Sequence, residues 1–287
     1  MSLKKINNFI LKEAAPIFRY NGLNNFEDFW NIKAEWFEPP NTRRGGWSGV
    51  SNLRLKMPGG KNDFGIFLKR QENHISHTLG HPVKGILTFE REANNLFFLQ
   101  KRGIPSLKVL FFARQETKKS RRAILITQEL KGYISLKKML QNCHNEEKTG
   151  TPGYNLMMHS VAGVVKKMHE NHLQHNCLYA KHIFIHQSLL ENNFKKTEIH
   201  ENPIKLIDLE KAKIRLFKSQ CMRRDLYTLN RHTEYLSLKD RLRFFKFYTG
   251  CKKICNQKKI LELIADYKGT PENSKLIRSN KKTKDLL

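Results

Sequence analysis

Short apolar runs separated by turn-rich segments fill the first half of the chain. Residues 43–57 and 64–71 are strand-like and are joined by the linker Pro-Gly-Gly-Lys-Asn-Asp, which predicts two paired strands. Residues 87–105 place apolar side chains at helical spacing and close with a glycine and a proline, which predicts one helix. Two more strand-like runs follow, at 106–115 and 121–130.

Longer helical patterns dominate from residue 135 onwards. Residues 135–143 and 155–173 keep apolar side chains at helical spacing. Two short apolar runs, 182–186 and 204–209, flank a polar insertion and predict a small hairpin. A strand-rich part with one helix, followed by a helix-rich part, predicts an α+β fold with two lobes in the order of a protein-kinase-like chain.

These patterns also set the expected boundaries. We expect an N-terminal extension with aromatic anchors at residues 1–40 and a strand-rich N-lobe at 41–130. A mostly helical C-lobe at 131–268 and a basic tail at 269–287 should follow.

Composition narrows the class of protein. With 39% hydrophobic and 10% aromatic residues, the chain is typical of a globular protein. It has no run of about 18 apolar residues that would predict a membrane span. The N-terminus also lacks the apolar core of a signal peptide, so we expect a cytoplasmic protein whose five cysteines are free thiols.

The charge of the chain points to an anionic partner. There are 53 basic and 26 acidic residues, which gives a formal net charge of +27. Such an excess favours nucleic acid, anionic lipid headgroups or a phosphorylated glycolipid. The basic residues are spread along the chain without zinc-finger spacing or an RNP-type aromatic motif, so we expect no dedicated nucleic-acid module. Nucleic-acid binding stays open as an alternative that rests on charge alone, beside peripheral association with an anionic membrane.

The lobe order suggests a phosphotransferase that positions charges around ATP and Mg²⁺. Three glycines stand in a strand–turn–strand setting where backbone amides can approach phosphate: Gly45, Gly46 and Gly49. Lys69 ends an apolar run, as a strand lysine facing a nucleotide does. In the following helix Glu92 lies at the edge of the apolar face, and we prefer it to Glu90 as the partner of Lys69. Taken singly, these residues also suit a plain hairpin turn and a surface lysine.

Asp208 ends the second short apolar run of the back half and is the candidate Mg²⁺ ligand. The tripeptide Asp63-Phe64-Gly65 spells the metal-binding motif of protein kinases, but chain order excludes it because it precedes Lys69. The connection between the lobes supplies the hinge Gln128-Glu129-Leu130, whose backbone is expected to meet adenine, with Glu129 and Leu130 as the nucleotide-binding candidates. Thr127 is expected at the back of the same pocket.

Together these motifs resemble the lipopolysaccharide kinase family, and within it the InaA-like branch. The resemblance covers about residues 42–250 and rests on segments that follow the family's order: RRGGWSGVS, FLKRQ, FERE, RGIP, HNCLYAKHIF, LIDLEKAK and RRDLYTLNRHT. It implies a protein-kinase-like bilobal fold and phosphorylation of a sugar in the inner core of lipopolysaccharide at the cytoplasmic membrane face.

The same resemblance assigns roles in the segment HNCLYAKHIF. His175 matches the loop histidine, and Cys177 falls where active kinases carry the base aspartate. His182 falls on a metal-ligand position, where the family commonly has histidine. Asp225 is expected to support the loop by accepting hydrogen bonds from its backbone or from His175. A thiol replaces a carboxylate base poorly, although metal and phosphate positioning dominate phosphoryl transfer.

Two hypotheses follow for the function. The first is an ATP-dependent phosphotransferase acting on the lipopolysaccharide core or another anionic glycolipid, with Asp208 and His182 holding Mg²⁺ and with His175 and Cys177 in the catalytic loop. The alternative is a pseudokinase or nucleotide-binding scaffold whose partner is a protein or a lipid.

Overall fold

The computed structural model describes residues 8–250 except 44, 61, 79 and 191–201. The chain divides into two compact units, Met1–Lys101 with Leu107–Lys131 and Arg102–Ser106 with Gly132–Leu287. The predicted basic tail, residues 269–287, lies outside the described residues.

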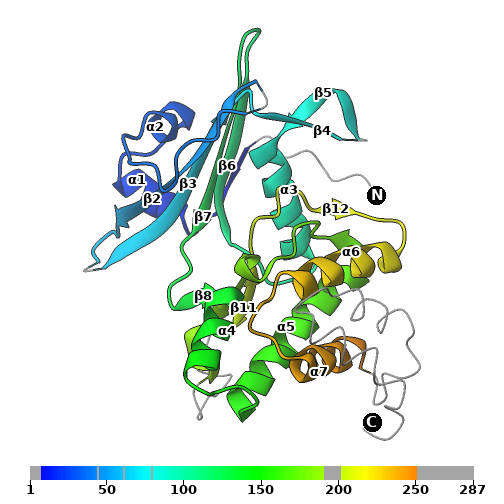
Figure 1. The fold of residues 1–287 in the computed structure, drawn as a ribbon. Helices are drawn as coiled ribbons and strands as arrows, with labels where there is room; N and C mark the ends of the chain where they lie inside the picture. Colours follow the sequence, from blue (N-terminus) through cyan, green and yellow to red (C-terminus); the bar gives the residue numbers. More distant parts are fainter. Residues whose placement is uncertain (1–7, 44, 61, 79, 191–201, 251–287) are drawn as a thin grey trace, which may run out of the picture. The chain divides into compact units, whose positions relative to one another are not determined.

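The first unit is built around a five-stranded antiparallel sheet in the order β1-β6-β7-β3-β2 (Figure 1). The strands β4 and β5 form a separate hairpin. The strands of this unit are β1 Asn8–Ile10, β2 Trp47–Lys56, β3 Asp63–Glu72, β4 Ile75–Thr78, β5 His81–Leu87, β6 Val109–Glu116 and β7 Arg121–Gln128. Since β2 and β3 pair from Trp47 opposite Glu72 to Lys56 opposite Asp63, the first predicted strand pair is confirmed.

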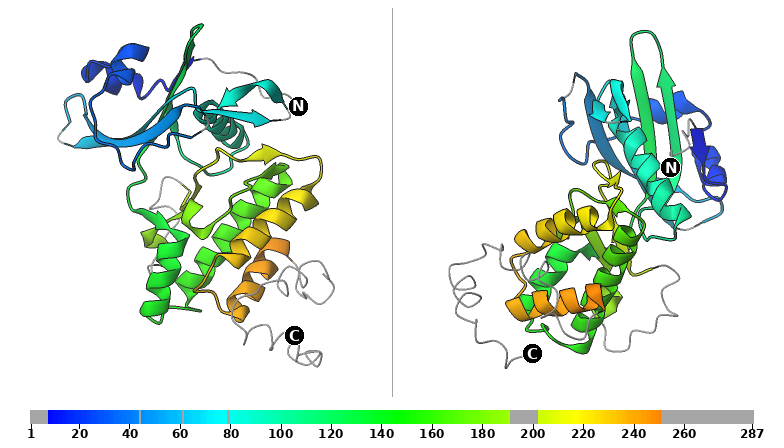
Figure 2. Two further views of the ribbon diagram at one scale, coloured as in Figure 1. Left: turned by 45° about the horizontal axis from the view of Figure 1, so that its top comes forward. Right: turned by 90° about the vertical axis from the view of Figure 1, so that its right-hand side faces the viewer.

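Helices cover both faces of this sheet (Figures 1 and 2). They are α1 Ala15–Tyr20, α2 Phe26–Trp30 and α3 Thr88–Lys101. The helices α1 and α2 contribute to an apolar core that includes the fully buried Ile66 and Leu68 of β3. Successive side chains of a strand point to opposite faces. Lys69 therefore points to the other face, on which α3 packs.

The N-terminal residues belong to this unit through backbone and side-chain contacts. The strand β1 pairs with β6 at the edge of the sheet. The guanidinium of Arg70, which is buried, donates to the carbonyls of Trp30 and Ile32 at 2.7 and 2.8 Å and stacks on the ring of Trp36. The segment that the sequence sets apart as an extension is therefore fastened to the strand that carries Lys69.

The second unit is mostly helical. Its helices are α4 Leu136–Asn145, α5 Pro152–Glu170, α6 Lys218–Arg231 and α7 Leu238–Thr249, with short 3-10 turns η1 Ala180–His182 and η2 Gln187–Leu190. The helix α5 packs against both α6 and α7, and residues such as Val161 and Val165 are fully buried there. No helix in the described part of the chain combines the length and apolar character needed to span a bilayer.

Short strands complete this unit. They form a three-stranded sheet in the order β11-β10-β8 and a two-stranded pair of β12 with β9. Their bounds are β8 Tyr133–Ser135, β9 Leu173–Gln174, β10 Ile183–His186, β11 Ile204–Leu206 and β12 Lys213–Ile214. The antiparallel pairing of β10 with β11 confirms the small hairpin predicted from the two apolar runs.

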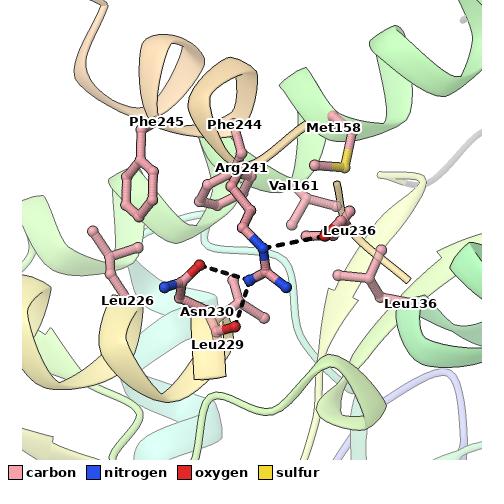
Figure 3. Close-up of a pocket in the computed structure, with 10 residues that line it drawn as sticks. All are labelled: Leu136, Met158, Val161, Leu226, Leu229, Asn230, Leu236, Arg241, Phe244 and Phe245. Atoms are coloured by element: carbon pink, nitrogen blue, oxygen red, sulfur yellow. Dashed lines mark hydrogen bonds between the residues drawn. The ribbon is translucent and has the colours of Figure 1, made fainter. Parts of the chain in front are cut away.

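A small, mostly apolar pocket lies among α5, α6 and α7 (Figure 3). The buried Arg241 beside it donates to the backbone carbonyls of Asn230, Thr233 and Leu236 and to the side chain of Asn230. The carbonyls at a helix C-terminus have no partner within the helix. The guanidinium therefore ties the end of α6 to α7, and we assign this pocket a structural role.

Candidate active site

Lys69 and Glu92 form the ion pair predicted from the sequence. The ammonium of Lys69 lies 2.6 and 2.9 Å from the two carboxylate oxygens of Glu92. The side chains are 16% and 2% exposed. Because burying two charges is costly, a pair held this far from water indicates a role beyond stability.

The choice between two glutamates of α3 is settled by a second ion pair. Glu90 is also buried, but its carboxylate lies 3.1 Å from the guanidinium of Arg114 on β6. Each glutamate therefore has its own cation, and Glu92 is the one that faces the strand lysine.

Gln71 fixes the start of α3 relative to β3, a role that sequence reasoning missed. Its buried side-chain oxygen accepts from the backbone N–H of Phe89 at 2.6 Å and from the hydroxyl of Thr88 at 2.8 Å. The first amides of a helix have no intrahelical partner, so this oxygen caps α3 from outside. Gln71 is two residues from Lys69, and the glutamine in FLKRQ was the available signal.

The three glycines occupy different settings. Asn41 and Ser48 exchange two backbone hydrogen bonds, of 2.8 and 2.9 Å, that close a loop containing Gly45 and Gly46. Gly45 has φ +75°, which suits glycine, and Gly46 packs so closely on the Glu72 carbonyl that a side chain would collide with it.

Gly49 departs from the prediction. It lies within β2 opposite Arg70, and a Cβ there would collide with the ring of Trp36. Gly49 thus faces the opposite side of the sheet from Lys69, and its small size makes room for an aromatic ring. Its predicted place in a phosphate-binding turn is wrong.

Glu129 and Leu130, the hinge residues predicted to meet adenine, are also only partly as expected. The N–H of Glu129 donates to the carbonyl of Gly65 at 3.0 Å, and its carboxylate pairs with Arg54. That amide is therefore committed within the first unit and is not available to adenine, so the predicted contact of Glu129 with adenine stays a prediction that its carbonyl alone can meet. Leu130 follows it in the connection to the second unit.

Thr127 lies on the face of the sheet that carries Lys69. It pairs with Phe67, two residues before Lys69 on β3. Its hydroxyl is buried and has no hydrogen-bond partner among the described residues. Its position at the back of a nucleotide pocket stays a prediction.

In the second unit, Asp225 anchors the loop that follows β9. One carboxylate oxygen accepts from the N–H of His175 at 2.6 Å, and the other accepts from the N–H of Asn176 at 2.8 Å. His169 Nε2 lies 3.2 Å from the same carboxylate. Asp225 is fully buried, so this carboxylate organises the loop from beneath, as predicted.

His175 joins the loop to the strand end that carries Asp208. Its Nε2–H donates to the carbonyl of Ile207 at 3.0 Å, and the ring is fully buried. Burial lowers the pKa of His175, so the ring is neutral at physiological pH. His175 therefore connects the loop to the strand end through a buried hydrogen bond.

His182 and Asp208 are brought together as predicted. His182 Nδ1–H donates to the carbonyl of Cys177 at 2.9 Å, and Nε2 lies 3.2 Å from a carboxylate oxygen of Asp208. Burial lowers the pKa of His182 and outweighs the Asp208 carboxylate, which acts in the opposite direction. The lowered pKa favours the neutral ring. Since Nδ1 carries the proton, Nε2 then directs a lone pair at the carboxylate. Two acceptors that face each other in this way are arranged to share a cation or a proton.

The backbone of Asp208 also marks this position. Its φ is +56°, in the left-handed region that residues other than glycine seldom adopt. Backbone held in such a conformation is common at functional sites.

Mg²⁺ fits this pair if the substrate supplies further ligands. No three His, Cys, Asp or Glu side chains in the described residues cluster closely enough to hold a metal ion alone. Mg²⁺ usually binds one or two carboxylates together with phosphate oxygens and water. Asp208, whose side chain is 46% exposed, offers that carboxylate. Imidazole is not a preferred Mg²⁺ ligand, so His182 would act by orienting Asp208 or through a bound water.

Cys177 contributes its backbone to this arrangement. Its carbonyl accepts from His182 Nδ1 and from the N–H of Tyr179 at 2.8 Å. Burial raises the pKa of the Cys177 thiol, so the side chain is neither a thiolate nor an effective base near neutral pH. The site residues thus form two clusters, one in each unit, and the second has a thiol where a kinase base is expected.

Comparisons with known proteins agree with these features. A model of the lipopolysaccharide kinase (Kdo/WaaP) family matches residues 27–248. Protein InaA of Escherichia coli (strain K12) is 28% identical over 211 residues, which cover 74% of this chain and 89% of that protein.

A solved structure described as WaaP in complex with acyl carrier protein superposes with a TM-score of 0.63 at 17% identity, over 96% of this chain and 99% of that one. This likeness confirms the predicted α+β, protein-kinase-like fold. The family match covers most of the chain and the InaA likeness supports it, so this chain belongs to the lipopolysaccharide kinase (Kdo/WaaP) family, whose members are kinases.

Proposed function

We propose that this protein transfers the γ-phosphoryl group of ATP to a hydroxyl of the lipopolysaccharide core or a similar anionic glycolipid. The reaction would take place at the inner face of the cytoplasmic membrane, with the protein bound peripherally. The observation that carries the proposal is the buried pair of Lys69 with Glu92, because a buried lysine held by a helix glutamate suits the nucleotide phosphates.

In this proposal each cluster has a distinct task. Lys69, oriented by Glu92, binds the α- and β-phosphates, and the Gly45 turn offers backbone amides to them. Asp208, assisted by His182, holds Mg²⁺, which neutralises developing charge on the transferred phosphoryl group when it is bound. Asp225 and His175 keep the loop and the strand end in register.

The net charge of +27 suits the proposed acceptor. Anionic headgroups and phosphorylated sugars attract basic residues near a membrane surface. The same charge raises the local concentration of the polyanionic substrate before the site engages it.

Cys177 favours a second candidate, a nucleotide-binding scaffold without turnover. A protonated thiol accepts the hydroxyl proton of an acceptor sugar poorly. Positioning by metal and phosphate contacts supplies most of the rate in phosphoryl transfer, so a slow enzyme is also compatible with this residue.

Two measurements on the purified protein test the proposal. Thermal unfolding with ATP, with Mg²⁺ and with both should show the largest stabilisation for the combination. Phosphate transfer to lipopolysaccharide core oligosaccharide is then followed with labelled ATP. Stabilisation without transfer would favour the scaffold, and absence of both would reject nucleotide-dependent function.

A further inference from the structure

The connection between β12 and α6 exposes large apolar side chains. Ile214, Leu216 and Phe217 are 40%, 82% and 63% exposed. Figure 1 shows this connection in yellow at the edge of the second unit. Single exposed apolar residues are normal on a protein surface, but three within four consecutive residues indicate a contact site.

These side chains are presented by a held backbone. Ile214 pairs with Leu173 in the two-stranded sheet. The N–H of Arg215 donates to the carbonyl of His172 at 2.8 Å, and its guanidinium donates to Gln174 at 2.7 Å. The main chain before Leu216 is held by these contacts, and the chain after it enters α6 at Lys218, so the exposure of Leu216 belongs to the fold.

Cations surround the apolar residues. Residues 211–224 contain six basic residues and no acidic residue. Lys218, Arg223 and Arg224 are exposed on the first turns of α6. The combination of aliphatic and aromatic tips with flanking lysine and arginine is typical of segments that lie in the interface of an anionic bilayer.

We propose that residues 211–224 form a membrane-docking surface. Leu216 and Phe217 enter the headgroup region of an anionic bilayer, and the exposed Lys218, Arg223 and Arg224 bind its phosphates. Nucleic acid offers no apolar medium for Leu216, and an apolar protein patch would not require six cations. Charge and apolar exposure together therefore select an anionic membrane.

This surface is continuous with the catalytic loop of the same unit. The strand β9, which pairs with β12, leads directly into His175, and residue 211 is three positions after Asp208. Docking would therefore place the bilayer beside the loop. Its use in catalysis rests on the proposed function, whereas docking itself requires no turnover.

The test is vesicle flotation with the full chain carrying Leu216→Ser and Phe217→Ser. Vesicles of phosphatidylcholine with phosphatidylglycerol should bind the wild type, and the double variant should bind at least about tenfold more weakly because two apolar side chains are lost from the interface. Val83→Ser is the matched control, since Val83 is 85% exposed beside Lys84 in the first unit. It should leave vesicle binding unchanged.

A second variant examines the charge. Lys218→Gln should weaken binding to the same vesicles by about fivefold, and pure phosphatidylcholine vesicles should bind neither protein well. Unaltered thermal unfolding of all variants would show that they are folded, as expected for exposed positions.

The outcomes separate docking from catalysis. Full vesicle binding by the double variant would overturn the docking surface even if the wild type phosphorylates glycolipid. Loss of vesicle binding in the double variant, with its stabilisation by Mg-ATP intact, would support the docking surface even if no phosphate transfer is found. Equal binding to charged and uncharged vesicles would overturn the assignment to an anionic membrane.

Discussion

At the scale of single residues, the charged side chains of the two clusters have identifiable tasks. A lysine that is mostly removed from water needs a partner, and Glu92 supplies both carboxylate oxygens to Lys69. His182 Nε2 lies 3.2 Å from a carboxylate oxygen of Asp208, and we propose that this pair serves the Mg²⁺ site. The two pairs lead to separate predictions, because we assign Lys69 with Glu92 to the nucleotide phosphates and Asp208 with His182 to the metal ion.

Lys69→Met should abolish the stabilisation of the protein by Mg-ATP in thermal unfolding. The substitution keeps a long side chain and removes the charge that we assign to the nucleotide phosphates. Lys148→Met is the control, because Lys148 pairs with Glu146 on the surface of the second unit and both side chains are more than half exposed. If Lys69→Met retained the full stabilisation, the nucleotide role of the first unit would be wrong.

Asp208→Asn should remove the Mg²⁺-dependent part of the stabilisation by ATP, since the amide replaces the anionic ligand with a neutral one. A titration of Mg²⁺ at fixed ATP measures this directly. Asp63→Asn is the matched control, because Asp63 belongs to the Asp-Phe-Gly tripeptide that chain order excludes and is exposed at the start of β3. A response of Asp63→Asn in place of Asp208→Asn would reverse our assignment.

Cys177→Asp should raise the rate of phosphate transfer to core oligosaccharide. A positioned general base contributes roughly 10²–10⁴-fold, so a site that lacks only its base should respond within that range. Cys177→Ser is the control, because serine supplies no carboxylate. If Cys177→Asp stays inactive while Mg-ATP still stabilises the protein, the scaffold hypothesis is favoured.

At the scale of secondary-structure elements, the relation of α3 to β3 depends on Gln71. The side chain of Gln71 closes the N-terminus of α3, so the helix that carries Glu92 is tied to the strand that carries Lys69. In the second unit, Asp225 of α6 ties the loop after β9 in a comparable way. In both units, a buried side chain from one element satisfies backbone amides of another.

Gln71→Ala should lower the free energy of unfolding by about 1–3 kcal/mol, because the N–H of Phe89 and the hydroxyl of Thr88 lose a buried acceptor. Denaturant unfolding measures this loss, and stabilisation by Mg-ATP should fall with it as Glu92 loses its position. Gln115→Ala, on strand β6 of the same sheet, should change the free energy of unfolding by no more than about 0.5 kcal/mol. Equal effects of the two substitutions would remove the special role of Gln71.

At the scale of the whole molecule, the net charge of +27 dominates long-range interactions. It is distributed over the chain, so it attracts any polyanion at low salt. Apolar exposure at residues 214–217 distinguishes a membrane from other polyanions, because apolar contacts survive salt that screens charge.

Binding to anionic vesicles should therefore weaken from low to physiological salt and then level off, whereas binding to duplex DNA should continue to fall steeply with log salt concentration. Parallel flotation and DNA-binding titrations at several salt concentrations measure the two slopes. Identical slopes would mean that charge alone governs both and would revive the nucleic-acid alternative.

The sequence by itself determined the order of the elements and the identity of most charged site residues. Apolar spacing identified β2, β3 and α3, because a residue's face follows from its position along a strand or helix. The same spacing placed Glu92 at the edge of the buried face of α3. Family resemblance marked His175, His182 and Asp225 through the segments that contain them.

Only the tertiary structure decided what each of these residues contacts. Gly49 and Trp36 are separated by 13 positions, so no local pattern shows that the glycine makes room for the ring. The carbonyl of Gly65 takes the amide of Glu129 through pairing of strands that are distant in sequence. The cap that Gln71 provides and the exposure of Leu216 likewise depend on which surfaces the folded chain brings together or leaves uncovered, and local periodicity carries no information about either.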